Sequence, residues 1–437
     1  MLTIAIVAVF LTGYACIALE SVIKVNKAAV ALFMFVACWT LFMMAPGIYF
    51  PGTHDAVGAA LQAIESDLGE TATTLFFLMG AMTIVEVVDQ NGGFNFVRDL
   101  LGTTSKRRLL WRIALMTFLL SAILDNLTTS IVLIMVLRKL VPQRQDRMIY
   151  DAIIVIAANA GGAFSPICDV TTIMLWNGGM ITAAKTIMHL LLPSLLSMLI
   201  PALVLQFALH GTLQQVASST ATSEQELTAW ERKTVFVLGV GGLIFVPIFR
   251  YLTDLPPFMG ILFVLAMLWI TTELFYAHLK VEETASNRVA RLLSHIDMAT
   301  ILFFLGILMA VNCLKHIGVL SALGQWLNSV SGGNHYLVTG FIGIISSIVD
   351  NVPLVAGCMG MYPLAAAGDM AVDGTFWQLL AYCAGVGGSM LIIGSAAGVV
   401  VMGLENISFG WYLKRITPVA LAGYLAGMLG YWIQTLV

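Results

Sequence analysis

Two Asp-Asn pairs lie in stretches that are otherwise almost entirely apolar. Asp125-Asn126 separates WRIALMTFLLSAIL from LTTSIVLIMVL, and Asp350-Asn351 lies within SSIVDNVPLVAG. A charged side chain at membrane depth costs about 2.5–3.5 kcal/mol even on the scale that gives the lowest values. Helix capping is one reason to place Asp or Asn there, but Asn or Ser would cap a helix without a buried charge. The choice of Asp in both pairs therefore indicates that the charge itself is used.

A third acid follows a stretch that cannot form a continuous helix at low cost. In NAGGAFSPICDVTT, two glycines and a proline precede Asp169, and proline removes a backbone donor and clashes with the preceding turn. A kinked helix with small residues at a helix crossing is the simpler interpretation. The alternative is an ion site, because unwound backbone at this depth must be surrounded by protein or line a cavity. Four oxygen-bearing side chains would then lie beside the freed carbonyls: Ser165, Asp169, Thr171 and Thr172.

These residue types suit a site that binds a cation and a proton in competition. Hard cations prefer oxygen ligands, and carbonyls freed at broken helices coordinate Na⁺ in transporters. Exposed helix N-termini alone would favour an anion, but three carboxylates would repel one. Burial raises the pKa of a carboxyl group, and acids that share a site raise one another's pKa further. A site that holds either a proton or a metal ion, but not both, exchanges them across a membrane.

Glu86, in LFFLMGAMTIVEVVDQ, is a further candidate, expected within a membrane span. It has no acidic counterpart in the second half of the chain. A single polar residue satisfied by a neighbouring helix is the simpler interpretation. The functional interpretation is a group that couples proton movement to the ion site.

The composition requires a membrane protein around these residues. Of 437 residues, 59% are hydrophobic and 10% are charged, whereas soluble domains carry about 25% charged residues. Apolar segments of about 20 residues fit helices that cross about 30 Å of hydrocarbon. The segments with Asp-Asn pairs are predicted to be re-entrant helical hairpins, at about 108–140 and 335–366, and two others to be helices broken near the midplane, at 151–182 and 376–409. This all-α arrangement leaves ten crossings.

The basic residues support this topology. With the N-terminus outside, all but Lys185, Arg250 and Lys315 of the 21 Lys and Arg residues fall on one side. Cytoplasmic loops carry an excess of Lys and Arg, so that side is predicted to be cytoplasmic, with both termini periplasmic.

The chain also repeats itself. LFFLMGAM (75–82) resembles LFFLGILM (302–309), SAILDN (121–126) resembles SSIVDN (346–351), and NAGGAFSPICD (159–169) aligns with GVGGSMLIIGS (385–395), at offsets of 227, 225 and 226. One duplication explains a nearly constant offset. The predicted repeats are 1–209 and 234–437, joined by a cytoplasmic linker at 210–233. Five crossings in each half make the repeats inverted, and inverted repeats with broken helices are typical of secondary transporters.

The strings DNLTTSIVLIMVLRKL, NAGGAFSPICDVTTIMLW and SSIVDN resemble the NhaD family of sodium/proton antiporters, in the ion transporter superfamily. The resemblance runs through nearly the whole chain, although Cys168 stands where members commonly have glycine. It implies extrusion of Na⁺, and also of Li⁺, against protons in a bacterial inner membrane. It also implies a homodimer with a moving transport domain that contains the hairpins. The positions that match functional positions of the family are Glu86, Asp125, Asn126, Asp169, Thr171, Thr172, Ser346, Ser347, Asp350, Asn351, Ser389 and Ser395.

The sequence therefore predicts a secondary transporter that exchanges Na⁺ for protons, not an enzyme. The expected Na⁺ ligands are Asp125, Asn126, Asp169, Asp350 and Asn351, with Ser165, Thr171, Thr172, Ser347, Ser389 and Ser395 as neutral members of the same cation and proton site. The expected partners are the ions and the lipid bilayer, with no cofactor and no nucleic acid.

Two alternatives stay open from the sequence. A carboxylate or oxyanion transporter of the same superfamily would require neutral hairpin tips and a basic residue in the site, and no Lys or Arg lies near either tip at depth. An intramembrane aspartyl protease would use Asp125 and Asp350, but the YD and GxGD pair shared by such enzymes is absent.

Overall fold

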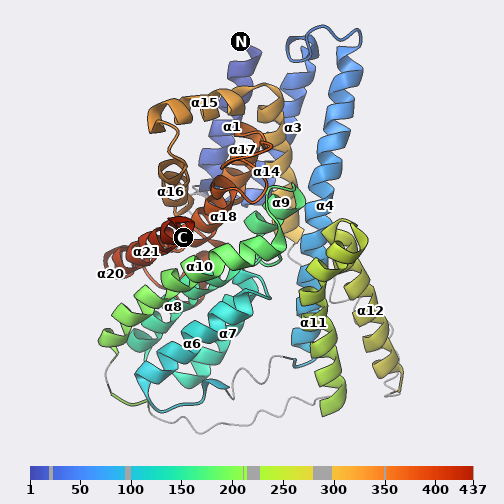
Figure 1. Ribbon diagram of the computed structural model, residues 1–437. Coiled ribbons are helices and arrows are strands. Elements are labelled where there is room, and N and C mark those ends of the chain that lie inside the picture. Colours follow the sequence, from blue (N-terminus) through green and yellow to red (C-terminus); the bar gives the residue numbers. More distant parts are fainter. Residues whose placement is uncertain are drawn as a thin grey trace.

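The protein is a bundle of helices (Figure 1). The computed structural model describes residues 1–18, 23–93, 100–209, 211–213, 227–278, 298–348 and 351–436. Within these ranges the only β-structure is an isolated bridge between Ser105 and Thr212. In the part of the chain that the structure describes, six helices are long and apolar enough to cross a membrane: Ala56–Gln90, Ala183–Ala208, Ala229–Thr253, Pro257–Tyr276, Met298–His316 and Thr417–Leu436. The prediction of an all-α, multi-pass membrane protein is confirmed.

One set of helices, here called the first helix group, forms the right and upper part of Figure 1. Helix α14 packs against α3 and α4, and the pair α11–α12 packs against α4. A Cβ on Gly306 would lie 2.5 Å from the Ala31 carbonyl carbon, so α14 and α3 touch backbone to backbone. The group consists of α1 (Leu2–Ala18), α3 (Lys27–Met43), α4 (Ala56–Gln90), α11 (Ala229–Thr253), α12 (Pro257–His278) and α14 (Met298–His316).

The remaining bundle, here called the second helix group, contains both Asp-Asn segments. Its first part has α6 (Lys106–Ser121), α7 (Asn126–Leu140), α8 (Arg144–Ala163), α9 (Val170–Asn177) and α10 (Ala183–Leu205), which continues into the short 3₁₀ helix η2 (Gln206–Ala208). Its second part has α16 (His335–Ser346), α17 (Asn351–Met361), α18 (Thr375–Gly387), α19 (Ala396–Glu405), α20 (Phe409–Arg415) and α21 (Thr417–Leu436). The two parts pack on each other through α10 with α21, α8 with α18 and α7 with α19.

Helix α9 joins the two groups. Trp176 packs edge-on against Phe77 of α4, with ring centroids 6.3 Å apart. Its carbonyl accepts a hydrogen bond from Arg250 of α11, whose guanidinium also lies 5.0 Å from the indole ring. The end of α9 is therefore fixed to the first helix group, while its beginning lies in the second.

Helix α4 is longer than hydropathy predicts. We expect an apolar span over 72–90, but the helix begins at Ala56, where the Asp55 side chain caps it by accepting from Gly58 N. At 1.5 Å per residue its 35 residues extend about 52 Å, more than the hydrocarbon thickness. Hydropathy marks where a helix enters hydrocarbon and says nothing of where its hydrogen bonds begin.

Helix α15 (Val319–Ser331) is absent from the sequence prediction. It lies across the upper end of the bundle in Figure 1 and buries Leu320 and Gly324. Its 13 residues are too few to span a bilayer, so a search for long apolar runs does not find it. The short 3₁₀ helix η1 (Pro46–Ile48) lies in the connection before α4.

Most of the predicted cytoplasmic linker, 210–233, lies outside the described residues. The described start of the linker pairs with the residues before α6, because Leu213 N donates to the Thr104 carbonyl at 2.7 Å. Its end opens α11 with a capping box between Thr228 and Glu231.

Candidate functional site

Asp125 begins α7 and uses its carboxylate to cap that helix. Oδ1 accepts from Thr128 N at 2.8 Å, and Oδ2 accepts from the Thr128 hydroxyl at 2.6 Å. Helix α6 ends at Ser121, so a turn of four residues brings the chain from one helix to the next. The capping role of Asp125 is thus present in the structure, and the half-buried side chain lies in the turn between two packed helices.

Asp169 has the same position at the start of α9. Its Oδ1 accepts from Thr171 N at 3.1 Å and from the Thr171 hydroxyl at 3.0 Å. The Thr172 hydroxyl donates to the carbonyls of Ser165 and Asp169 at 2.7 and 2.8 Å. Helix α8 ends at Ala163, so residues 164–169 run between two helices, and Asp169 is 3% exposed. A buried acid therefore lies where backbone carbonyls leave the helical hydrogen-bond pattern.

Ser165 links this break to the turn before α7. Its hydroxyl donates to the Ala122 carbonyl at 2.7 Å and lies 3.3 Å from the Cys168 Sγ. Cys168 is buried and fits the break as a free thiol. The turn with Asp125 and the break with Asp169 are therefore held side by side by a direct hydrogen bond.

Two glycines leave room around the Asp169 carboxylate. A Cβ on Gly385 of α18 would lie 3.0 Å from Asp169 Oδ2, and one on Gly162 of α8 would lie 3.4 Å from Asp169 Cβ. Helix α18 belongs to the second part of the group, so both parts of the chain reach this carboxylate.

A chain of three polar side chains crosses from α7 to α19. Asn126 Nδ2 donates to Asn159 Oδ1 at 3.0 Å, and Asn159 Nδ2 donates to Ser395 Oγ at 3.0 Å. Ser395 Oγ also accepts from Gly398 N, which caps α19. Asn159 is absent from the predicted ligands, although it opens the NAGG string. The signal that could have found it is an amide within IIVIAANAGGA, where no other side chain is polar.

Most of the predicted residues of the second part make no hydrogen bond to Asp125, Asn126 or Asp169 among the described residues. The Ser347 and Ser389 hydroxyls donate to carbonyls three residues earlier, Ile344 and Val386, each at 2.6 Å. Asn351 is half-buried at the first position of α17, and Asp350 lies outside the described residues. The structure thus brings together Asp125, Asn126, Ser165, Asp169, Thr171, Thr172 and Ser395, and leaves Ser347 and Ser389 bonded to their own helices.

Several contacts occur twice, at the offset of the sequence repeat. The Ser121 hydroxyl donates to the Ala158 carbonyl at 2.6 Å, and the Ser346 hydroxyl donates to the Ala384 carbonyl at 2.8 Å. Asp169 and Ser395, which the sequence repeat aligns, both cap the helix that follows a break. Three pairs of positions therefore keep one geometry in the two parts: Ser121 and Ser346, Ala158 and Ala384, and Asp169 and Ser395.

Known proteins match the chain over most of its length. A family model described as a citrate transporter matches residues 6–379. Sodium/proton antiporter 2 of Arabidopsis thaliana is 40% identical over 426 residues, which cover 96% of this chain and 96% of that protein. Sodium/proton antiporter 1 of the same plant is 43% identical over 98% of this chain and 72% of its own length. The Na⁺/H⁺ antiporter NhaD of Vibrio cholerae is 31% identical over 96% of this chain and 89% of that protein.

The chain belongs to the NhaD family of sodium/proton antiporters. It is therefore a secondary transporter of the ion transporter superfamily, and the alternative of an aspartyl protease is removed.

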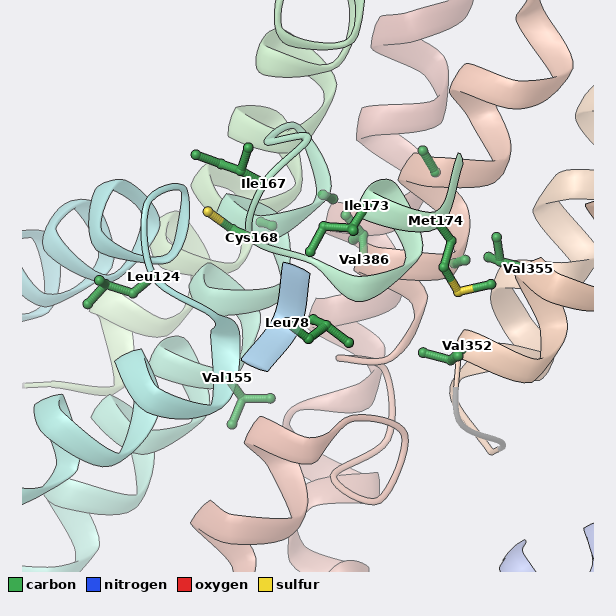
Figure 2. Packing of buried hydrophobic residues seen from close by; sticks show 14 of the residues in the cluster. Leu78, Leu124, Val155, Ile167, Cys168, Ile173, Met174, Val352, Val355 and Val386 are labelled. Atoms are coloured by element: carbon green, nitrogen blue, oxygen red, sulfur yellow. The ribbon is translucent and has the colours of Figure 1, made fainter. Parts of the chain in front are cut away.

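Figure 2 shows buried apolar side chains of this NhaD-type chain that pack together. They come from α4, the turn before α7, α8, the break, α9, α17 and α18, and every one of them is buried. Electrostatic interactions are stronger in such surroundings than in water. The labelled members of this cluster are Leu78, Leu124, Val155, Ile167, Cys168, Ile173, Met174, Val352, Val355 and Val386.

Glu86 lies apart from these groups. Its Oε1 accepts from Gln90 on the same helix at 3.0 Å. Helix α4 reaches α9 at Thr74, whose hydroxyl accepts from Asn177, and at Phe77. Twelve helical residues separate Thr74 from Glu86, or about 18 Å. The coupling role of Glu86 stays a prediction.

For an antiporter of this family, Asn159 is expected to set the position of the neutral ligands. Asn159→Ala removes both side-chain bonds of a buried amide, which should raise the apparent KM for Na⁺ about 10-fold, the lower end of the effect of losing a ligand-orienting partner. The measurement is Na⁺-dependent proton movement in everted vesicles.

Asn177→Ala is the matched control, because it removes an amide that bonds to Thr74 at the other end of α9. An unchanged KM in Asn159→Ala would show that the three-residue chain does not orient ligands.

Proposed function

We propose that this protein moves Na⁺ across a membrane in exchange for protons, and that Li⁺ can replace Na⁺. One observation supports this most directly: the Asp169 carboxylate is buried at a helix break, joined through Ser165 to the turn that holds Asp125. Two carboxylates, amide and hydroxyl oxygens and freed carbonyls are ligands for a hard cation. The similarity to proteins named sodium/proton antiporters supports the same transported ions.

In this proposal, proton and Na⁺ compete for Asp125 and Asp169. A carboxyl group out of water is held neutral unless a cation compensates its charge. Arrival of Na⁺ therefore displaces a proton, and departure of Na⁺ to the other side lets a proton return. Asn126, Asn159 and Ser395 supply neutral oxygens and fix the geometry, and Asp350 and Asn351 complete the site from the second half.

We further propose that 1–209 and 234–437 are inverted repeats, with re-entrant hairpins formed by α6–α7 and α16–α17. The contacts that recur at the repeat offset support this arrangement. The second helix group would then move as a transport domain against the first, in a homodimer with ten crossings per chain. By the distribution of Lys and Arg, both termini lie on the outer side of the membrane. Residence in a bacterial inner membrane stays a prediction.

A carboxylate transporter is the second candidate, because the matching family model is described by citrate. An anion site requires a cationic side chain or neutral surroundings. Arg138 of α7 and Arg147 of α8 instead bind Glu405. Each lies twelve helical residues, or about 18 Å, from Asn126 and Asn159 respectively. The residues that the structure brings together carry acids, which disfavours this candidate.

The purified protein in proteoliposomes tests the proposal. We expect Na⁺ or Li⁺ on one side to drive protons to the other, and citrate uptake to be absent. Citrate uptake without Na⁺-driven proton movement would reject antiport in favour of the second candidate.

A further inference from the structure

Asp151 of α8 is a buried acid that the proposed ion site does not use. It is 0% exposed, and neither carboxyl oxygen has a hydrogen-bond partner in the part of the chain that the structure describes. An ionised carboxylate without donors is costly to bury. In this conformation Asp151 is therefore held in its neutral, protonated form.

An ion-paired cluster lies beside it. Glu405, at the end of α19, accepts from Arg138 Nε at 2.5 Å and from Arg147 Nε at 2.7 Å. These three side chains are the charged groups that act on Asp151, from α19, α7 and α8. At the same end of the bundle, Arg144 Nη2 donates to the Asn406 carbonyl. We call Arg138, Arg144, Arg147 and Glu405 the basic end.

Arg147 and Asp151 are four residues apart on one helix. Side chains at this spacing are neighbours on the helix surface. Arg147 now donates Nε to Glu405 and Nη1 to the Val141 and Pro142 carbonyls, so its guanidinium is bonded to these groups and not to Asp151 in this conformation. The basic end thus holds two alternative partners for one arginine, and the charge of Asp151 decides between them.

The helices place Asp151 in line with the ion site. Asp151 precedes Gly162 by 11 residues, or three turns and about 20°, so both lie on one face of α8, about 16 Å apart along the axis. Gly162 lies against Asp169. Thr129 of α7 is fully buried, one turn along the helix from Asn126, which bonds to α8. Helices α7, α8 and α19 therefore share a polar chain at one end and the basic end at the other.

We propose that Asp151 is a second proton-binding group of the exchange cycle, which carries protons between the basic end and the ion site. Asp151 gives its proton to the aqueous phase when Arg147 moves from Glu405 to it. The ionised carboxylate then accepts the proton that Na⁺ displaces from Asp125 or Asp169, and Arg147 returns to Glu405. Chains of protonatable side chains serve as proton relays in membrane transporters. This inference rests on the proposed function.

Two transport measurements on Asp151→Asn test it. Exchange of radioactive Na⁺ for unlabelled Na⁺, without a pH gradient, requires the ion site but no net proton transfer, and we expect it to be retained. Na⁺-driven proton movement should fall about 100-fold, the lower part of the contribution of a positioned proton-transfer group. Asp151→Glu keeps a carboxyl group and should restore part of it.

The matched control is Asp146→Asn, five residues earlier on α8, where Asp146 pairs with Lys106 at 2.6 Å. It should leave both measurements near those of the unmodified protein. Equal loss of both fluxes in Asp151→Asn would show that Asp151 only maintains the fold, and normal proton movement would show that no proton passes through it. Either result overturns the relay and leaves the proposed function standing, whereas absence of Na⁺ flux in the unmodified protein would reject the proposed function itself.

Discussion

Asp169→Asn is expected to reduce Na⁺-driven proton movement by at least about 100-fold, because removing a partner that only orients a metal ligand already costs about 10- to 100-fold. An amide cannot take up or release a proton near neutral pH, and it has no charge to offset that of Na⁺. Its oxygen can still accept from Thr171 N, as the carboxylate does, and Asn caps helices as well as Asp. The start of α9 should therefore survive, so that the loss reports on chemistry and not on folding.

The measurement is dissipation of a pH gradient by Na⁺ in everted vesicles, with the amount of protein in the membrane determined in parallel. Asp146→Asn again serves as the control, because it also neutralises an acid and lies at the start of α8, far from the break. Exchange at the unmodified rate in Asp169→Asn would remove this residue from the mechanism.

Much of the fold can be predicted from the sequence because hydrocarbon imposes strict conditions. Backbone groups in lipid must be bonded internally, so long apolar runs such as that of α14 can only be helices. Pro166 marks the interval between α8 and α9 because proline cannot continue the hydrogen-bond pattern, whereas Gly161 and Gly162 lie in the last turn of α8. The polar half of α4 and the short helix α15 could not be found in this way, because neither is defined by burial in hydrocarbon.

The site is predictable in its acids and less so in its neutral groups. A carboxylate at depth is costly enough to be informative alone, which is why Asp125 and Asp169 can be selected from the sequence. Burying a hydroxyl costs little free energy, because it can donate to its own helix, as Ser347 and Ser389 do here. Its presence at depth therefore does not indicate a ligand. Asn159 could not be selected in this way. Its role depends on hydrogen bonds to Asn126 and Ser395, which only the packing of α7, α8 and α19 brings within reach.

Gly161→Ala and Gly387→Ala are expected to be strongly damaging to folding. A Cβ on Gly161 would lie 2.3 Å from the Phe118 carbonyl oxygen, and one on Gly387 would lie 2.2 Å from the Gly343 carbonyl oxygen. The obstacle is backbone in both cases, so no flexible side chain can move aside. Overpacking of this kind costs about 3 kcal/mol, and α6 would separate from α8, or α16 from α18. We expect a lower Tm, less folded protein and loss of transport in both variants.

Two other glycines provide controls for the effect of an added methyl group. Gly162→Ala would place its Cβ 3.4 Å from the nearest atom, an ordinary contact, so its folded yield should be near that of the unmodified protein. Gly69→Ala, on α4, meets nothing within 4 Å and should preserve both folding and transport.

The comparison of Gly161→Ala with Gly387→Ala also bears on the proposed repeat. If α6–α8 and α16–α18 descend from one packing unit, the two variants should lower Tm by similar amounts. A large loss in one variant and none in the other would mean that the two halves pack differently, and would separate the sequence repeat from the architecture inferred from it.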